Sequence, residues 1–150
     1  MPNARMNYFV DTNVIVYAVD TGAVAKRQVV VDLLRQMITD QTLVLSPQSL
    51  NECYRVITDR KRLLSRQDAR EFVLGLSGSC TAPLSFEVTR KAWQIQDLAG
   101  YSFWDCMLLA SATMAGCDVF VSEDMQHGHK LNDLTIMSPF EADFADHFSF

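Results

Sequence analysis

The chain has 150 residues, of which 49% are hydrophobic and 21% charged, and its formal net charge is −5 at pH 7. This length suits one domain that buries a core without disulfides or a structural metal. The four cysteines show no C-x-x-C spacing, and no apolar run approaches the roughly 20 residues of a membrane span. We therefore expect a single cytoplasmic domain without membrane association. The negative net charge argues against binding of nucleic acid through the overall charge of the protein. Such binding would need a local basic patch or a metal ion.

Short β-forming runs alternate with segments of helical periodicity. Strands are predicted at 8–10, 43–45 and 119–121, and a fainter one at 134–137. Helices are predicted over the segments whose apolar residues repeat every three or four positions, several of them preceded by a capping serine. These segments are 24–38, 47–57, 66–76, 86–98 and 103–115. The alternation predicts an α/β fold with a parallel sheet.

Four acidic residues fall where these strands end or these helices begin. Asp11 directly follows the first strand, and Asp124 comes shortly after the 119–121 strand. Glu52 and Asp105 lie in the first turns of two helices. Taken alone, each acid is better explained as a helix cap or turn residue than as part of a site. In an open parallel sheet, however, ligands bind at the carboxyl ends of the strands, so all four side chains can converge on one crevice.

Such a crevice would need a counter-charge, because neighbouring carboxylates raise each other's pKa. Hard oxygen ligands suit Mg²⁺ or Mn²⁺, which keep several waters and also bind phosphate oxygens. A metal held in this way serves the hydrolysis of phosphodiesters. It would also allow an acidic protein to bind a polyanion.

The order of these motifs resembles the PIN-domain family of metal-dependent ribonucleases. The matching stretches are V-D-T-N-V at 10–14, N-E at 51–52, W-D at 104–105 and S-E-D-M at 122–125. The end of the chain is most similar to the compact bacterial VapC-type toxins of toxin–antitoxin pairs. The resemblance implies a single PIN domain over residues 1–150. It also implies a three-layer α/β/α architecture around a short central parallel sheet of order 3-2-1-4-5.

The resemblance further implies that the four acids are both the catalytic residues and the metal ligands, with Mg²⁺ or Mn²⁺ as cofactor. These acids are Asp11, Glu52, Asp105 and Asp124. Three polar residues take supporting positions around them, namely Thr12, Asn13 and Ser122. The implied activity is endonucleolytic cleavage of tRNA or another structured RNA. The implied partners are a second copy of the chain and a small antitoxin, through which the complex would bind operator DNA.

Several other residues are weaker candidates. The basic run Arg60-Lys61-Arg62 could contact RNA, although cations near a helix C-terminus are commonly just solvated. Glu123 competes with Asp124 for the fourth acidic position. Participation of the 127–129 stretch, which contains His127 and His129, and of Asp20 stays open.

Two other functions compete with the nuclease. An aspartate-nucleophile phosphohydrolase also ends its first strand in an aspartate, but it needs a second carboxylate two residues further on, where this chain has Asn13. A non-catalytic protein-binding module with the same fold would not need the four acids. Their joint presence favours the nuclease.

Overall fold

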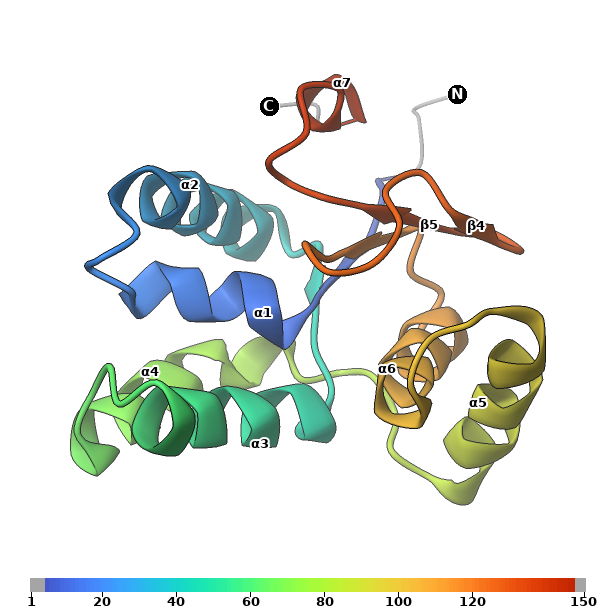
Figure 1. Cartoon of the computed structure of the whole chain (residues 1–150), viewed down its shortest axis with the longest axis horizontal. Helices are drawn as coiled ribbons and strands as arrows, with labels where there is room; N and C mark the ends of the chain where they lie inside the picture. Colours follow the sequence, from blue (N-terminus) through green and yellow to red (C-terminus); the bar gives the residue numbers. More distant parts are fainter. Residues whose placement is uncertain (1–4, 148–150) are drawn as a thin grey trace.

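The structure is a computed structural model, and it describes residues 5–147. Figure 1 traces the chain from blue to red. The elements in chain order are β1 (Tyr8–Val10), α1 (Thr12–Ile15), the 3₁₀ turn η1 (Val16–Val19), α2 (Val24–Asp40), β2 (Leu43–Val44), α3 (Pro47–Arg55), the π-helical turn η2 (Val56–Arg60), α4 (Arg66–Leu76), the 3₁₀ turn η3 (Ser77–Ser79), α5 (Phe86–Leu98), α6 (Phe103–Met114), β3 (Val119–Val121), β4 (Lys130–Leu131), β5 (Leu134–Met137) and α7 (Phe144–His147). Every helix and strand predicted from the sequence is present.

The sheet has the order β2-β1-β3-β5-β4. Four strands are parallel, and only β4 runs antiparallel, beside β5. At the outer edge of β2, Leu45 forms an isolated parallel bridge with Cys80. With this bridge counted as the third strand in chain order, the parallel part has the expected order 3-2-1-4-5. The short hairpin strand β4 is an addition that the sequence did not indicate.

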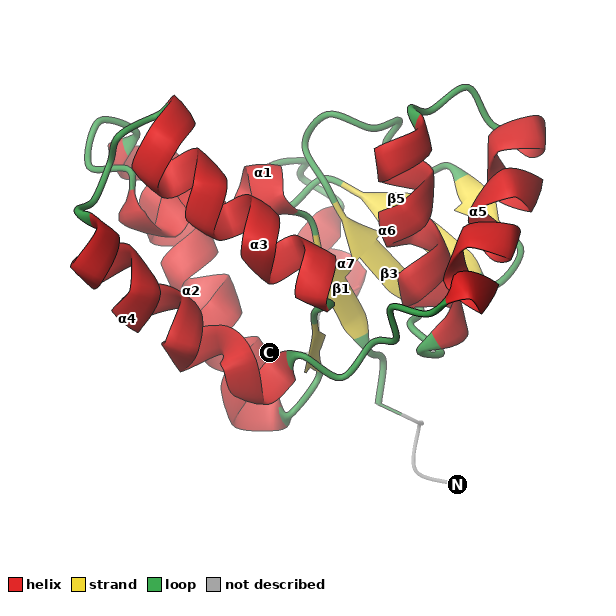
Figure 2. Ribbon diagram, turned by 90° about the horizontal axis from the view of Figure 1, so that it is seen from below, coloured by secondary structure: helices red, strands yellow, loops and turns green. Residues whose placement is uncertain are grey.

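Helices cover both faces of the sheet, which confirms the three-layer architecture (Figure 2). Successive strand side chains point to opposite faces. Tyr8 and Val10 join the core under α1 to α4. Phe9 and Phe120 join the core under α5 and α6, and their rings stack with centroids 5.3 Å apart. Both faces are therefore buried, as expected for a parallel sheet.

The predicted helix starts are explained by capping. Ser46 forms a reciprocal capping box with Ser49 ahead of α3, and Pro47 occupies the first helical position. Ser65 and Ser102 accept hydrogen bonds from backbone N–H groups in the first turns of α4 and α6. In the described part of the chain, no helix is both long and apolar enough to cross a membrane.

Candidate functional site

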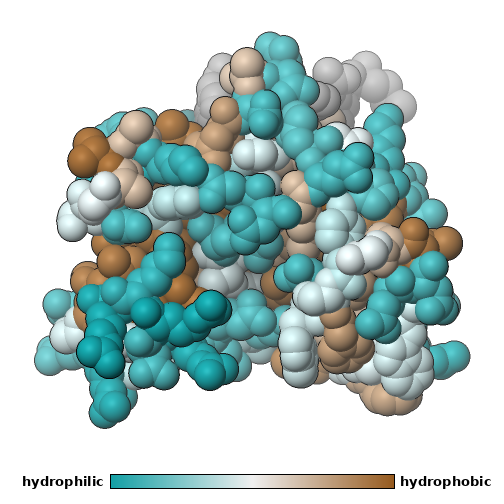
Figure 3. Space-filling model, in the orientation of Figure 1, coloured by the Kyte–Doolittle hydropathy of each residue, from teal (hydrophilic) through white to brown (hydrophobic). Residues whose placement is uncertain are grey.

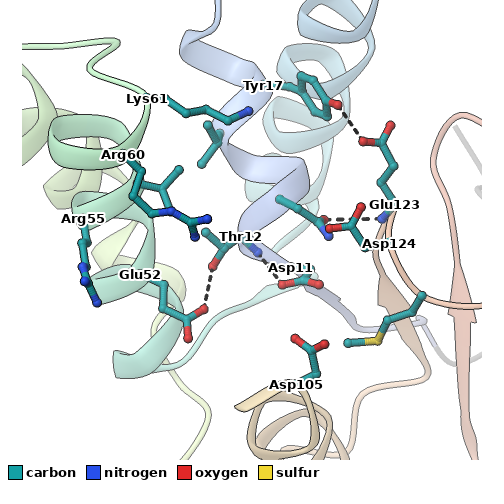
Figure 4. Close-up of a pocket in the computed structure, with 14 residues that line it drawn as sticks. Asp11, Thr12, Tyr17, Glu52, Arg55, Arg60, Lys61, Asp105, Glu123 and Asp124 are labelled. Carbon is teal, nitrogen blue, oxygen red and sulfur yellow. Dashed lines mark hydrogen bonds between the residues drawn. The ribbon is translucent and has the colours of Figure 1, made fainter. Parts of the chain in front are cut away.

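A pocket of about 600 Å³ opens at the carboxyl ends of β1 and β3 (Figure 4). All four predicted acids line it, and so do Thr12 and Asn13. A fifth acid and three basic residues complete its charged lining. These are Glu123, Arg55, Arg60 and Lys61. The topology thus brings together acids that are far apart in the sequence, as the rule for parallel sheets predicts.

Asp11 lies deepest, at the junction of β1 and α1, and is only 5% exposed. Its backbone N–H donates to Val121 O of β3 at 2.8 Å, which fixes the residue at the sheet edge. Its Oδ1 accepts from the Thr12 N–H at 2.8 Å, and its Oδ2 accepts from the Ser122 hydroxyl at 2.9 Å. Asp11 is therefore both the N-cap of α1 and the floor of the pocket.

The surroundings of the Asp11 carboxyl disfavour its ionised form. Burial raises its pKa to about 7, with further increases from the charges of Asp105 and Glu52. The hydrogen bonds from Ser122 and from the Thr12 backbone oppose this rise without cancelling it. A buried carboxyl with a pKa this high favours either a proton or a cation beside it.

Ser122 and Asn13 connect the loop after β3 to the first helix. The Asn13 Nδ2 donates to Ser122 Oγ at 3.3 Å, and its Oδ1 accepts from the Glu123 N–H at 3.4 Å. Ser122 is fully buried and does not line the pocket itself. Its hydroxyl orients the Asp11 carboxylate from behind, which fits the supporting role implied for it.

Glu52 is fixed by two neighbours. The Thr12 hydroxyl donates to its Oε2 at 3.3 Å, and the Gln48 amide donates to its Oε1 at 3.0 Å. The same Gln48 Nε2 donates to the backbone oxygen of Trp104 at 3.2 Å, so Gln48 links α3 to the start of α6. The sequence reasoning did not identify Gln48. Its position one helical turn before Glu52 is the signal that would have suggested it.

The other two acids form the opposite rim. Asp105 is in the first turn of α6, where its N–H donates to Ser102 Oγ at 3.2 Å. Burial raises the pKa of its carboxyl; the Ser102 side chain opposes the rise, and the charge of Asp124 adds to it. Asp124 is exposed on the loop after β3. Both side chains line the pocket, and the charge of Asp124 reaches Asp105 across it.

Glu123 has a different environment from Asp124. Its Oε1 accepts from the Tyr17 hydroxyl at 2.6 Å, and its Oε2 pairs with the Lys26 ammonium. Burial acts to raise the pKa of Glu123, but Lys26 and Tyr17 outweigh it and the pKa is lowered. Its negative charge is therefore already balanced, whereas Asp124 has no ion pair with any residue from 5 to 147.

The structure places only some of the predicted RNA-binding residues in the pocket. Arg60 and Lys61 line the pocket, but Arg62 does not. The sequence reasoning missed Arg55, which lines the pocket as well. Arg55 lies three residues after Glu52 on α3, so helical spacing could have placed it on the same side.

The remaining candidates lie outside the pocket lining. The His127 ring accepts from the Ser138 N–H at 2.9 Å and contacts Asp143 Oδ1 at 2.8 Å. His129 contacts the Tyr101 hydroxyl at 2.7 Å. Asp20 accepts from the Gly22 N–H at 3.1 Å, which stabilises the turn after η1. Each of these three side chains is therefore engaged in hydrogen bonds away from the pocket.

The chemistry of the acids fits a hard divalent cation, although their present spacing does not form a closed site. Across residues 5–147, no three His, Cys, Asp or Glu side chains are grouped closely enough to hold a metal ion. The carboxylates facing the pocket are oxygen donors of the kind that Mg²⁺ and Mn²⁺ prefer. Burial raises the pKa of the nearby Cys53 to about 12, so it stays a neutral thiol. Burial and the charges of Asp105 and Glu52 raise the pKa of Asp11, and a cation bound in the pocket would lower it.

Together, the fold and the site define a three-layer α/β/α protein with a carboxylate-lined pocket at its parallel sheet edge. The sequence model of the PIN domain matches residues 8–130. The chain belongs to the PIN-domain family.

One solved structure with the same fold is VapC20 of Mycobacterium tuberculosis, described as a toxin that cleaves the sarcin–ricin loop. The two structures superpose with a TM-score of 0.56 at 17% sequence identity, over 76% of this chain and 87% of VapC20. A comparison with curated proteins found no significant match. The structural likeness shows a common fold.

Proposed function

We propose that this protein is a metal-dependent endoribonuclease, the toxin of a toxin–antitoxin pair. The observation that carries the proposal is the convergence of four carboxylates from four separate elements on one pocket, one of them buried with its pKa raised to about 7. Membership of the PIN-domain family and the fold shared with a toxin that cleaves RNA support it. Four convergent acids have no evident purpose in a purely protein-binding module.

In this proposal, Asp11, Glu52, Asp105 and Asp124 hold one or more divalent cations. When bound, Mg²⁺ or Mn²⁺ supplies Lewis-acid activation of the phosphodiester and of the attacking water. Ser122 and the Thr12 N–H keep the Asp11 carboxylate oriented, while the Thr12 hydroxyl and Gln48 hold Glu52. No side chain needs to act as a nucleophile.

The environment of Asn13 argues against the alternative function of an aspartate-nucleophile phosphohydrolase. Both ends of its amide are engaged, with Ser122 and with the Glu123 backbone. An amide cannot deliver the proton that a second carboxylate would supply in that chemistry. We therefore place Asn13 among the supporting residues of a metal site.

We further propose a structured RNA as substrate, either tRNA or a ribosomal stem-loop of the kind named for VapC20. The partners would be a second copy of the chain and a small antitoxin, with operator DNA bound only through the antitoxin. We place the protein in the cytoplasm and treat residues 1–150 as one domain.

The decisive test combines cleavage with metal binding. Purified protein is incubated with total RNA and Mn²⁺, and new 5′ ends are mapped. Asp11→Asn and Asp105→Asn should reduce cleavage on the order of 100-fold or more, since groups that merely support metal ligands contribute about 10- to 100-fold. Calorimetry should show Mn²⁺ binding to the wild type and its loss in Asp105→Asn. Cleavage that persists in EDTA, or that is equal in the variants, would contradict the mechanism.

A further inference from the structure

The three basic residues that line the pocket lie together on one side of it. Arg55, Arg60 and Lys61 come from the end of α3 and from the turn that follows, and all three are exposed. Figure 4 places them on one side of the pocket, across from Asp11 and Asp124. In the space-filling view, the most hydrophilic side chains of this face gather over α3 and α4 (Figure 3).

These three cations form no ion pair with any residue between 5 and 147, although five carboxylates line the same pocket. Lys26, by contrast, pairs its ammonium with Glu123. The ammonium groups of Lys26 and Lys61 both lie near the Tyr17 ring, at 5.1 and 5.7 Å from its centroid, so Lys61 has a ring contact but no carboxylate partner. The three cations without an ion pair therefore stay available for an anion that residues 5–147 do not supply.

Arg60 and Lys61 line the pocket, whereas the next residue, Arg62, does not. The π-helical turn η2 ends with the Lys61 N–H donating to Val56 O at 2.9 Å, and Ile57 anchors the turn in the core with no exposed surface. Arg62 then adopts a left-handed conformation with a φ of 52°. The next N–H, that of Leu63, donates back to Ile57 O at 2.8 Å, so η2 ends at this point and Arg62 stays outside the pocket lining. Turns of this π type are frequent at functional sites.

Charge balance indicates which anion fits. At least one divalent cation among the four ionised carboxylates would leave at most two negative charges there. The three basic side chains exceed this remainder, so the loaded pocket would favour an anion such as a phosphodiester. Guanidinium groups bind phosphate oxygens through paired hydrogen bonds, and a protein of net charge −5 needs such a local patch to approach RNA.

We propose that Arg55, Arg60 and Lys61 form a phosphate subsite that binds a backbone phosphate of the RNA substrate next to the phosphodiester to be cleaved. This inference rests on the proposed ribonuclease function. The subsite sets which way the RNA strand crosses the pocket and holds it against the repulsion of the acidic side. Arg62 lies in the same sequence run but takes no part.

The test compares Arg60→Gln with Arg62→Gln, which remove the same charge from neighbouring exposed positions inside and outside the pocket. Binding of a fluorescent stem-loop RNA is measured by anisotropy at several salt concentrations, in an Asp105→Asn background that prevents cleavage. Arg60→Gln should weaken binding about tenfold. It should also reduce the slope of log K against log salt by about 0.7, the value for one phosphate contact on a single strand. Arg55→Gln and Lys61→Gln should act in the same direction.

Three readouts separate this inference from the proposed function. Mn²⁺ affinity measured by calorimetry in the otherwise wild-type protein should not fall in Arg60→Gln, because loss of a positive charge from the pocket does not weaken cation binding, and the variant should keep the wild-type melting behaviour. In cleavage assays Arg60→Gln should raise KM more than it lowers kcat. Equal effects of Arg60→Gln and Arg62→Gln in a wild type that cleaves RNA would overturn the subsite alone. Absence of cleavage by the wild type would overturn the nuclease, and absence of RNA binding would overturn the subsite.

Discussion

Asp11 carries a stability penalty that follows from its place in the pocket. Its carboxyl titrates near 3.8 in the unfolded chain and at about 7 in the folded protein. Between these values the folded state binds more protons, so the stability of the metal-free protein falls as pH rises from about 4 to 7. Asp11→Asn removes the penalty. We expect the variant in EDTA to be more stable at pH 7.5 by a few kcal/mol, on the scale of ~1.4 kcal/mol per pKa unit.

Thermal melts of both proteins at pH 4.5 and pH 7.5 check this expectation. The advantage of the variant should be small at pH 4.5 and large at pH 7.5. Glu71→Gln, which removes an exposed carboxylate of α4, should show no such trend. A variant that is less stable than the wild type at both pH values would show that the hydrogen bonds to Asp11 outweigh its burial.

Lys26 controls which acids are free in the pocket. Its ammonium and the Tyr17 hydroxyl hold the Glu123 carboxylate, whereas the neighbouring Asp124 has no cation partner in the described part of the chain. Lys26→Met should release Glu123 as an additional negative charge and tighten Mn²⁺ binding, on the order of fivefold for charges a few Å apart in a solvated pocket. Calorimetry measures the change. Adding Glu123→Gln should restore the original affinity, and a failure to restore it would separate Lys26 from this role.

The acids were predictable at the residue scale, but their partners were not. Strand ends and helix starts are readable from the sequence, and they placed Asp11 and Glu52 on one sheet edge. The pairing of Lys26 with Glu123 depends on how α2 packs beside the loop after β3, and these segments lie 97 residues apart. Contacts of that range leave no local signal.

At the scale of elements, the first turn of α6 both caps the helix and carries an acid of the pocket. The Ser102 hydroxyl accepts from the Asp105 N–H at 3.2 Å, which caps the helix and steadies the residue that carries one of the acids. Ser65 caps α4 through the same contact at 3.1 Å with Asp68, away from the pocket lining. Replacement of either serine by alanine should reduce the free energy of unfolding by about 1 kcal/mol.

Only the Ser102 replacement should affect the site. The Ser102 side chain also opposes the rise in the pKa of Asp105 that burial causes, so Ser102→Ala should raise this pKa further and weaken Mn²⁺ binding. Chemical denaturation gives the stability of each variant, and calorimetry at pH 6 and pH 8 gives the affinity. The affinity loss should be larger at pH 6, and Ser65→Ala should bind Mn²⁺ like the wild type.

Helices with marked caps were the most predictable elements. The α3, α4 and α6 starts match the sequence reasoning, because serine caps act within one turn and need no tertiary contact. No helix is predicted over 12–19, a segment whose valine and isoleucine residues favour strands. It is helical because Asp11 caps it and because Val14 and Ile15 are fully buried in the core under α1 to α4. Tertiary burial here overrides local preference.

At the scale of the whole molecule, the two cores meet across one short sheet. Met37 is fully buried in the core under α1 to α4, and Leu109 is fully buried in the core under α5 and α6. A single domain over residues 1–150 predicts that neither core unfolds alone. Met37→Ala and Leu109→Ala should each lower the free energy of unfolding by about 2–5 kcal/mol, as large-to-small core substitutions do.

The two tryptophans make this prediction testable, because both lie in one helical layer. Trp93 is on α5 and Trp104 on α6, so intrinsic fluorescence reports only that side of the sheet, whereas far-UV circular dichroism reports all helices. In urea, the two signals should give the same midpoint in the wild type. Met37→Ala, on the far side, should shift the fluorescence midpoint as much as the dichroism midpoint. A fluorescence midpoint that responds only to Leu109→Ala would mean that the layers unfold as separate units, with the pocket at their boundary.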